Sequence, residues 1–94
     1  MNVYPDQITV NITQADIDNG RQTECRRCPI ALASARVFSP RATISVSCAV
    51  VVDDHADSVQ LYHLSPAAKY WINLFDDYGA RFVSPTTLTF QRAA

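Results

Sequence analysis

One segment organises the chain: TQADIDNGRQTECRRCPIALASAR, residues Thr13–Arg36. It contains two helix-start signals, two of the three cysteines, and three arginines ahead of its final residue. Thr13 is a typical N-cap residue with Asp16 at the third following position, so we expect a short helical turn there. Asn19-Gly20 ends this turn, because both residues tolerate the left-handed conformation that terminates helices. The polar run 21–27 then predicts a surface loop.

Two longer helices follow. The first begins at Cys28-Pro29, because proline is favoured in the first helical turn, and Ser39-Pro40 stops it. Its alanine content predicts close packing against a sheet. The second begins at Ser65-Pro66 and is closed by Gly79. Its core-facing stripe has the helical spacing i, i+3, i+4 and i+7 and consists of Ala68, Trp71, Ile72 and Phe75.

Alternating apolar and polar residues predict strands around these helices. The clearest is Thr43–Val52, which we expect to be one uninterrupted strand with Cys48 on its core-facing side. From Ala49 onward both faces are apolar, so that end is covered on two sides or lies in an interface. The remaining extended segments are Gln7–Thr13, Val59–Leu64, Arg81–Val83 and Thr86–Gln91.

The main elements therefore follow the order strand, helix, strand, strand, helix, strand. This βαββαβ order is the split βαβ or ferredoxin-like pattern, an antiparallel sheet with two main helices on one face. We predict an α+β fold. The chain has 94 residues, which is the length of one domain, so residues 1–94 are expected to form a single domain.

Composition argues against several classes of protein. The net charge of −1 lacks the positive charge of a dedicated nucleic-acid-binding domain, so no specific nucleic acid is expected as partner. Residues 1–10 do not resemble a secretory signal, and no apolar run approaches the ~20 residues of a membrane span. An odd number of cysteines then favours a reducing cytoplasm. Charged residues are only 18% and apolar ones 48%, which favours a homodimer that covers apolar surface.

Cys25 and Cys28 form a C-x-x-C pair, which supplies half of a tetrahedral zinc site. The further candidate ligands are Cys48 and either His55 or His63. No second C-x-x-C or H-x-x-H accompanies the pair, and the alternation of strand residues places Cys48 in the core. A zinc site therefore remains the alternative, and structural cysteines are the preferred interpretation.

The arginines before the second helix suggest two other kinds of chemistry. A thiol at Cys28, beside Arg26 and Arg27, has the setting in which a lowered pKa permits redox chemistry. The exposed N–H groups after Pro29, with Arg21, Arg26 and Arg27 in the preceding loop, are the ingredients of a phosphate or carboxylate site. No glycine-rich cradle accompanies them. The simpler interpretations are a buried residue at the helix start and a solvated arginine loop.

Nothing in the chain points to catalysis. The acidic cluster at residues 53–57 lacks the glycine and distant glutamate of a calcium loop, so it predicts a solvated turn. With two histidines and no credible nucleophile–base pair, we expect no enzymatic activity. Tyr62, Tyr70 and Tyr78 are candidates for stacking on a base, whereas Trp71 fits the core stripe better.

Motifs in both halves of the chain resemble an uncharacterised family of small proteins that bacteriophages and prophages of actinobacteria and other bacteria encode. The resemblance implies a phage or mobile-element origin and carries no known activity. It covers most of the chain and rests on Ile12-Thr13-x-Ala15-Asp16-Ile17-x-x-Gly20, Cys25-x-x-Cys28-Pro29-Ile30-Ala31-Leu32-Ala33, Leu64-Ser65-Pro66-Ala67, Ile72, Phe75-Asp76 and Val83-x-Pro85-x-x-Leu88-x-Phe90.

We therefore expect a phage-encoded, non-enzymatic binding protein in the cytoplasm of a bacterial host cell, working as a homo-oligomer without cofactor. It would be a host-interaction or counter-defence factor that inhibits a host protein or sequesters a small anionic, nucleotide-like ligand. Arg21, Arg26, Arg27 and Cys28 are the candidate binding residues. The alternative is a zinc-stabilised or thiol-redox module that uses Cys25 and Cys28, with His55 as a further zinc ligand.

Overall fold

Five strands form one antiparallel sheet in the computed structural model, which describes residues 4–38, 42–54 and 59–93. Within these ranges, three α-helices and one 3-10 turn complete the fold, so the predicted α+β class is confirmed. In chain order the elements are β1 Gln7–Ile12, α1 Gln14–Asn19, α2 Pro29–Ala35, β2 Thr43–Val46, β3 Ala49–Asp53, β4 Val59–His63, α3 Pro66–Tyr78, η1 Ala80–Phe82 and β5 Thr86–Arg92.

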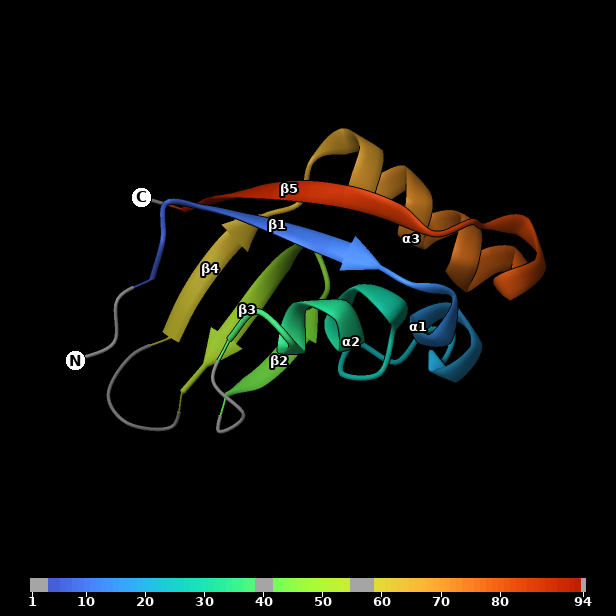
Figure 1. The fold of residues 1–94 in the computed structure, drawn as a ribbon, viewed down its shortest axis with the longest axis horizontal. Coiled ribbons are helices and arrows are strands. Elements are labelled where there is room, and N and C mark those ends of the chain that lie inside the picture. Colours follow the sequence, from blue (N-terminus) through green and yellow to red (C-terminus); the bar gives the residue numbers. More distant parts are fainter. Residues whose placement is uncertain (1–3, 39–41, 55–58, 94) are drawn as a thin grey trace.

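The strands lie in the order β1-β5-β4-β3-β2, and every neighbouring pair is antiparallel. β4 and β5 share only two paired positions, Tyr62 with Arg92 and His63 with Gln91. β1 and β5 therefore turn away from the other three strands, and the sheet is strongly curled (Figure 1). α2 contacts both edge strands, β1 and β2, so it lies across the opening of the curl.

Two hydrogen bonds satisfy backbone groups at the edges of the sheet. The Arg36 side chain donates from Nη2 to the carbonyl oxygen of Asn11 in β1, at 2.8 Å. The backbone N–H of Val46 in β2 donates to the carbonyl oxygen of Cys25, also at 2.8 Å. Open edge groups are a template for pairing with another chain. The Thr13–Arg36 segment therefore protects part of both edges as well as connecting β1 to β2.

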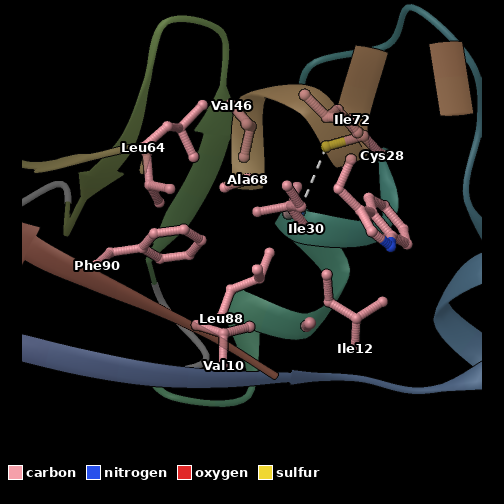
Figure 2. Close-up of a cluster of buried hydrophobic side chains, with 14 of the residues drawn as sticks. Val10, Ile12, Cys28, Ile30, Val46, Leu64, Ala68, Ile72, Leu88 and Phe90 are labelled. Atoms are coloured by element: carbon pink, nitrogen blue, oxygen red, sulfur yellow. Dashed lines mark hydrogen bonds between the residues drawn. The ribbon is translucent and has the colours of Figure 1, made fainter. Parts of the chain in front are cut away.

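Buried side chains of all five strands form one hydrophobic cluster with buried side chains of α1, α2 and α3. Figure 2 shows part of this cluster. The predicted core-facing stripe of α3 is confirmed, because all four of its residues are buried. The two largest polar-tipped side chains find partners: the Tyr62 hydroxyl donates to the Pro5 carbonyl (2.6 Å) and the Trp71 indole N–H to the Ser84 carbonyl (3.1 Å). Burial of these rings therefore leaves no unpaired polar tip.

The prediction of one strand over Thr43–Val52 was wrong. The chain turns at Ser47-Cys48 and returns as β3, with Val46 opposite Val50. Residues directly opposite in an antiparallel pair face the same side, so Val46 and Val50 are both buried and the turn preserves the period of two along the sequence. Cys48 consequently lies in the turn and is exposed, not in the core. Alternation alone could not reveal this hairpin.

The predicted βαββαβ order, with two main helices on one face, is not confirmed. The extra hairpin gives five strands, and the segment between β1 and β2 contains two short helices in place of one long helix. α2 ends at Ala35, ahead of Ser39-Pro40, which lies outside the described residues. Of the polar turn predicted at residues 53–57, Asp53 is the last residue of β3 and Asp54 follows it, whereas residues 55–57 lie outside the described ranges.

Two local predictions differ from the structure. Gly20 ends α1 as expected, but its φ of −70° is not left-handed. Glycine is needed because a Cβ there would lie 2.6 Å from Cγ of Pro29 and 2.8 Å from the carbonyl oxygen of Asp16. The segment predicted as extended over Arg81–Val83 is mostly the 3-10 turn η1, which Gly79 enters with a left-handed φ of 92°.

Candidate functional site

The loop 21–27 is closed by its own backbone. The N–H of Arg21 donates to the carbonyl of Arg27 (2.8 Å), and the N–H of Arg27 donates to that of Glu24 (3.0 Å). Thr23 adopts a positive φ of 59°, and its N–H donates to a carboxylate oxygen of Asp76 at the end of α3 (3.0 Å). The loop is therefore a defined turn fastened to α3. The side chains of Arg21, Arg26 and Arg27 remain exposed on it.

The N-terminus of α2 is not open to a ligand. Cys28 is its N-cap residue, and its sulfur accepts from the N–H of Ala31 at 3.4 Å while pointing into the core (Figure 2). Pro29, Ile30 and Ala31 are buried as well. Arg21, Arg26 and Arg27 are thus exposed on one loop, whereas the first residues of α2, whose N–H groups were predicted to complete an anion site, are buried.

The two cysteines of the C-x-x-C pair have different surroundings. Burial raises the pKa of Cys28 to about 11, so its thiol stays protonated at neutral pH. Cys25 is exposed. Metal binding and redox chemistry both require a thiolate, which the environment of Cys28 disfavours.

No group of three or more His, Cys, Asp or Glu side chains that could hold a metal occurs in the described parts of the chain. Of the predicted further ligands, Cys48 is in the exposed turn after β2 and His63 is exposed on β4. His55 lies outside the described residues.

A depression of about 430 Å³ borders Arg21, but acidic side chains outnumber basic ones in its lining. Asp18 and Glu24 line the same depression, and Glu24 Oε2 lies 3.9 Å from Arg21 Nη1. An anionic ligand there would meet two carboxylates beside one guanidinium. This geometry gives little support to a phosphate-binding site at Arg21.

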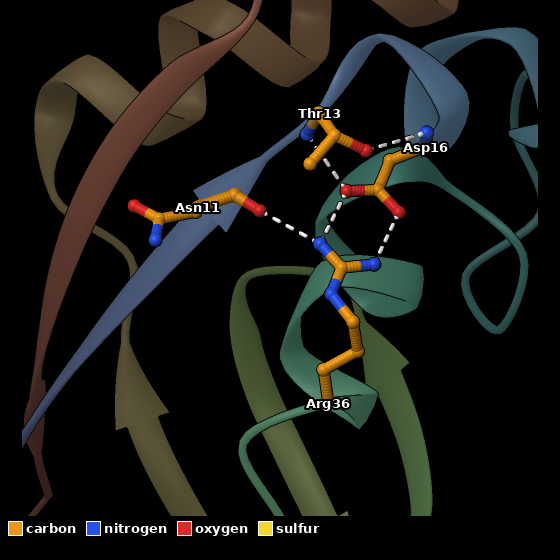
Figure 3. A network of polar contacts seen from close by, with 4 residues as sticks. All are labelled: Asn11, Thr13, Asp16 and Arg36. Atoms are coloured by element: carbon orange, nitrogen blue, oxygen red, sulfur yellow. Dashed lines mark hydrogen bonds and ion pairs between the residues drawn. The ribbon is translucent and has the colours of Figure 1, made fainter.

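The strongest polar network of this region involves an arginine that the sequence did not single out (Figure 3). Arg36 donates from both terminal nitrogens to the two carboxylate oxygens of Asp16, each at 2.6 Å. Asp16 also accepts from the backbone N–H of Thr13 (2.8 Å), and its own N–H donates to the Thr13 hydroxyl (3.2 Å), which completes a capping box. This network ties β1, α1 and α2 together, so its role is structural.

The environment of Asp16 keeps its carboxylate ionised. Burial alone would raise its pKa, but the hydrogen bonds from Arg36 and Thr13 outweigh burial and hold the pKa below its usual value. Nothing about sequence spacing predicts this pair, because the two residues are 20 positions apart and meet only through the packing of α1 against α2.

α3 carries a second apolar stripe, which flanks the core stripe and includes the half-buried Leu74. Ala67, Tyr70, Leu74 and Tyr78 follow at spacings of three, four and four residues, so they lie along one side of the helix. Tyr70 is 68% exposed and Tyr78 is 63% exposed. A surface helix of a globular protein ordinarily has one apolar stripe, which faces the core. Here a second stripe is left uncovered.

The chain that follows α3 forms the opposite wall of a groove. Phe82 is 63% exposed, and its ring centroid lies 5.5 Å from that of Tyr78. The hydrogen bond from Trp71 to Ser84 holds the next residues against the helix. The groove between these walls has a volume of about 360 Å³ and is lined by Ala67, Tyr70, Trp71, Leu74, Phe82, Val83, Ser84, Pro85, Thr86 and Leu88. We call these ten residues, together with Tyr78, the α3 surface.

The α3 surface combines three properties. None of its eleven side chains is charged. It contains three of the six large hydrophobic side chains that are exposed among the described residues, namely Tyr70, Tyr78 and Phe82. Its floor is rigid, because Trp71 and Leu88 belong to the core cluster. Such a surface is suited in its chemistry to apolar groups.

Sequence reasoning missed this surface, although a signal was present. The apolar residues 67, 70, 74 and 78 have a spacing as regular as that of the core stripe. The sequence nevertheless suggested only base stacking for Tyr70 and Tyr78. The contribution of Phe82 depends on η1, which was predicted as extended chain.

Comparison of the chain with protein-family models, with curated proteins and with solved structures gives no match. The resemblance to small phage proteins therefore stays a prediction. Across the three described ranges, the helices are too short or too polar to cross a membrane; α3, with 13 residues, is the longest of them.

Proposed function

We propose that this protein acts by binding another protein, without catalysing a reaction, and that the α3 surface makes the contact. The observation that carries the proposal is the second apolar stripe of α3, which is continuous with Phe82 across the groove. Large exposed apolar patches on soluble domains mark contact sites. Aromatic side chains are also the residues that contribute most to binding energy at such sites.

The chemistry of the surface favours a protein partner over the other candidates. Nucleic acids and small anions are bound through cationic side chains, and none lines the groove. The candidate arginines lie on the loop 21–27, where Arg21 has Asp18 and Glu24 as neighbours in the depression. An apolar segment of a protein is complementary to the aromatic and aliphatic groups of the α3 surface.

The likeness to small bacteriophage and prophage proteins suggests which partner to look for. We propose a host protein, met in the cytoplasm of an infected bacterial cell, that loses activity when this protein covers one of its apolar surfaces. The protein would then be a host-interaction or counter-defence factor without a cofactor. This part of the proposal rests on the resemblance alone, by association and not by geometry.

A zinc-stabilised or thiol-redox module is the alternative that the geometry supports less. The thiol of Cys28 is buried and holds the N-terminus of α2, so metal binding or oxidation would have to disrupt a formed helix start. Stoichiometric zinc in purified protein would support this alternative. We expect none, and we expect Cys25→Ser to leave stability unchanged because that thiol is exposed.

Affinity capture from a bacterial lysate, followed by calorimetry with the purified captured protein, tests the proposal. Three forms are compared: the wild type, Tyr70→Asp on the α3 surface, and Arg26→Ala combined with Arg27→Ala on the loop. We expect Tyr70→Asp to abolish binding and the loop variant to retain it. Binding that depends on the arginines and tolerates Tyr70→Asp would refute the proposal in favour of an anionic contact.

A further inference from the structure

We propose that, in the protein on its own, the α3 surface is covered by the same surface of a second copy, with the two α3 helices crossing at a two-fold axis near Leu74. This inference rests on the proposed function, because it assigns a partner to the same surface. A partner of another kind would then have to displace the second copy.

The spacing of the stripe is symmetric about Leu74. Tyr70 and Tyr78 lie four residues before and four residues after it, so the three side chains form a single i±4 ridge. A two-fold rotation about Leu74 places each Tyr70 beside the partner's Tyr78. Interdigitation of two i±4 ridges is the commonest mode of helix–helix packing in globular proteins. The ridge is thus complementary to itself, as a two-fold interface requires.

Charge permits this contact at the α3 surface. In a two-fold interface a residue on the axis faces its own copy, so a charge there would meet a like charge. Leu74 is uncharged and no charged side chain lines the groove, although the exposed Asp77 lies one helical turn after Leu74. The loop 21–27 is less suited to such a contact, because its three arginines outnumber Glu24 and two copies of it would bring net positive charges together. The net charge of −1 adds little repulsion between whole subunits.

The exposed area is of the right size. A full aromatic side chain covers about 150–250 Å², so Tyr70, Tyr78 and Phe82, exposed at 68%, 63% and 63%, offer roughly 300–500 Å² together. Standard interfaces bury about 800 Å² on each partner. The aromatic rings supply about half of this, and the aliphatic residues of the surface lie beside them. A weak to moderate dimer is expected.

Sedimentation equilibrium over a wide range of protein concentration tests the inference. The wild type should approach the mass of two chains at high concentration. Tyr70→Asp should raise the dissociation constant at least about a hundredfold, because each interface loses two anchors and gains two charges. The control is Leu61→Asp, which places the same charge at an exposed apolar position on β4. A wild type of one-chain mass at every concentration would overturn the inference, as would equal weakening by both variants.

A cysteine at the proposed axis tests the geometry separately. Leu74→Cys, in a protein with Cys25→Ser and Cys48→Ser, should form a covalent dimer rapidly under mild oxidation, because the two copies of residue 74 face each other. Val59→Cys in the same background is the control, since Val59 is exposed on β4, away from α3. Cross-linking at equal rates, or only through Val59→Cys, would exclude a two-fold axis at Leu74.

The outcomes separate the inference from the proposed function. If the wild type stays monomeric but binds a captured protein through Tyr70, the inference of a dimer is refuted and the proposed function stands. If Tyr70→Asp dissociates the dimer but leaves binding of the captured protein unchanged, the inference of a dimer stands and the proposed function is refuted. The first outcome is also the one expected if an apolar helix of another protein, and not a second copy, covers the α3 surface.

Discussion

The Thr13–Arg36 segment and the α3 surface differ in whether their side chains find partners within the chain. In the first, the carboxylate of Asp16 is held by Arg36 and Thr13, and the sulfur of Cys28 accepts from an N–H of α2. In the second, Tyr70, Tyr78 and Phe82 are more than half exposed over an uncharged groove. The aspartate, arginine and cysteine side chains of the first region therefore stabilise the fold. The aromatic side chains of the second region remain accessible for contact with other molecules.

The largest effect on stability is expected from Asp16→Ala. It leaves the guanidinium of Arg36 without its partner and removes the capping box of α1. Arg36 is half exposed, which moderates the loss, so we expect a decrease of about 2–4 kcal/mol in the free energy of unfolding. Urea denaturation measures it. Asp18→Ala, which removes the same charge from an exposed position of α1, should cost less than about 0.5 kcal/mol.

The same carboxylate makes stability dependent on pH. Its pKa is lower in the folded chain than in the unfolded one, so its contribution is complete above the ordinary value of about 3.9. The contribution is lost as pH falls through the lower folded value. The stabilities of the wild type and of Asp16→Ala should therefore converge in acid. A difference that stays constant from neutral pH into that range would contradict this role of Asp16.

The thiols should react at different rates. Burial raises the pKa of Cys28 to about 11, so its thiolate fraction at neutral pH is far smaller than that of an ordinary thiol. Burial slows it further. We expect an alkylating reagent to label Cys25 and Cys48 in the native protein and Cys28 only after unfolding, as mass spectrometry of peptides would show. Rapid labelling of Cys28 would instead support the redox alternative.

Gly20→Ala is expected to cost about 1–3 kcal/mol, because the added methyl group meets the Pro29 ring and the Asp16 carbonyl at once. Thermal unfolding measures the loss, with the exposed neighbour Asn19→Ala as control. If both substitutions have the same small effect, α1 and α2 are not packed as closely as the structure places them.

Tyr70→Asp should have the smallest effect on the stability of the subunit, within about 0.5 kcal/mol, because the side chain is mostly exposed. Tyr70 is thus expected to contribute little to the stability of the fold and most to binding. Denaturation at a concentration low enough to keep the wild type monomeric provides the measurement. A large loss of stability would mean that Tyr70 belongs to the core.

Much of the fold could be predicted from the sequence, and the reasons for the failures are physical. Local signals succeeded, as with the cap at Thr13 and the core stripe of α3. The hairpin at Ser47-Cys48 was missed because its turn preserves the period of two. The pairing of Arg36 with Asp16 depends on a contact between residues distant in sequence. The contribution of Phe82 to the groove depends on the turn after α3. The spacing of residue types predicts neither.

A dilution series followed by two-dimensional ¹H–¹⁵N NMR tests most directly whether contacts are made by the α3 surface or by the arginine loop. We predict that dilution shifts the amide signals of α3 and of residues 82–88, and leaves those of residues 21–28 unchanged. Shifts confined to residues 21–28, or to the exposed positions of β3 and β4, would contradict the assignment of the contact to α3.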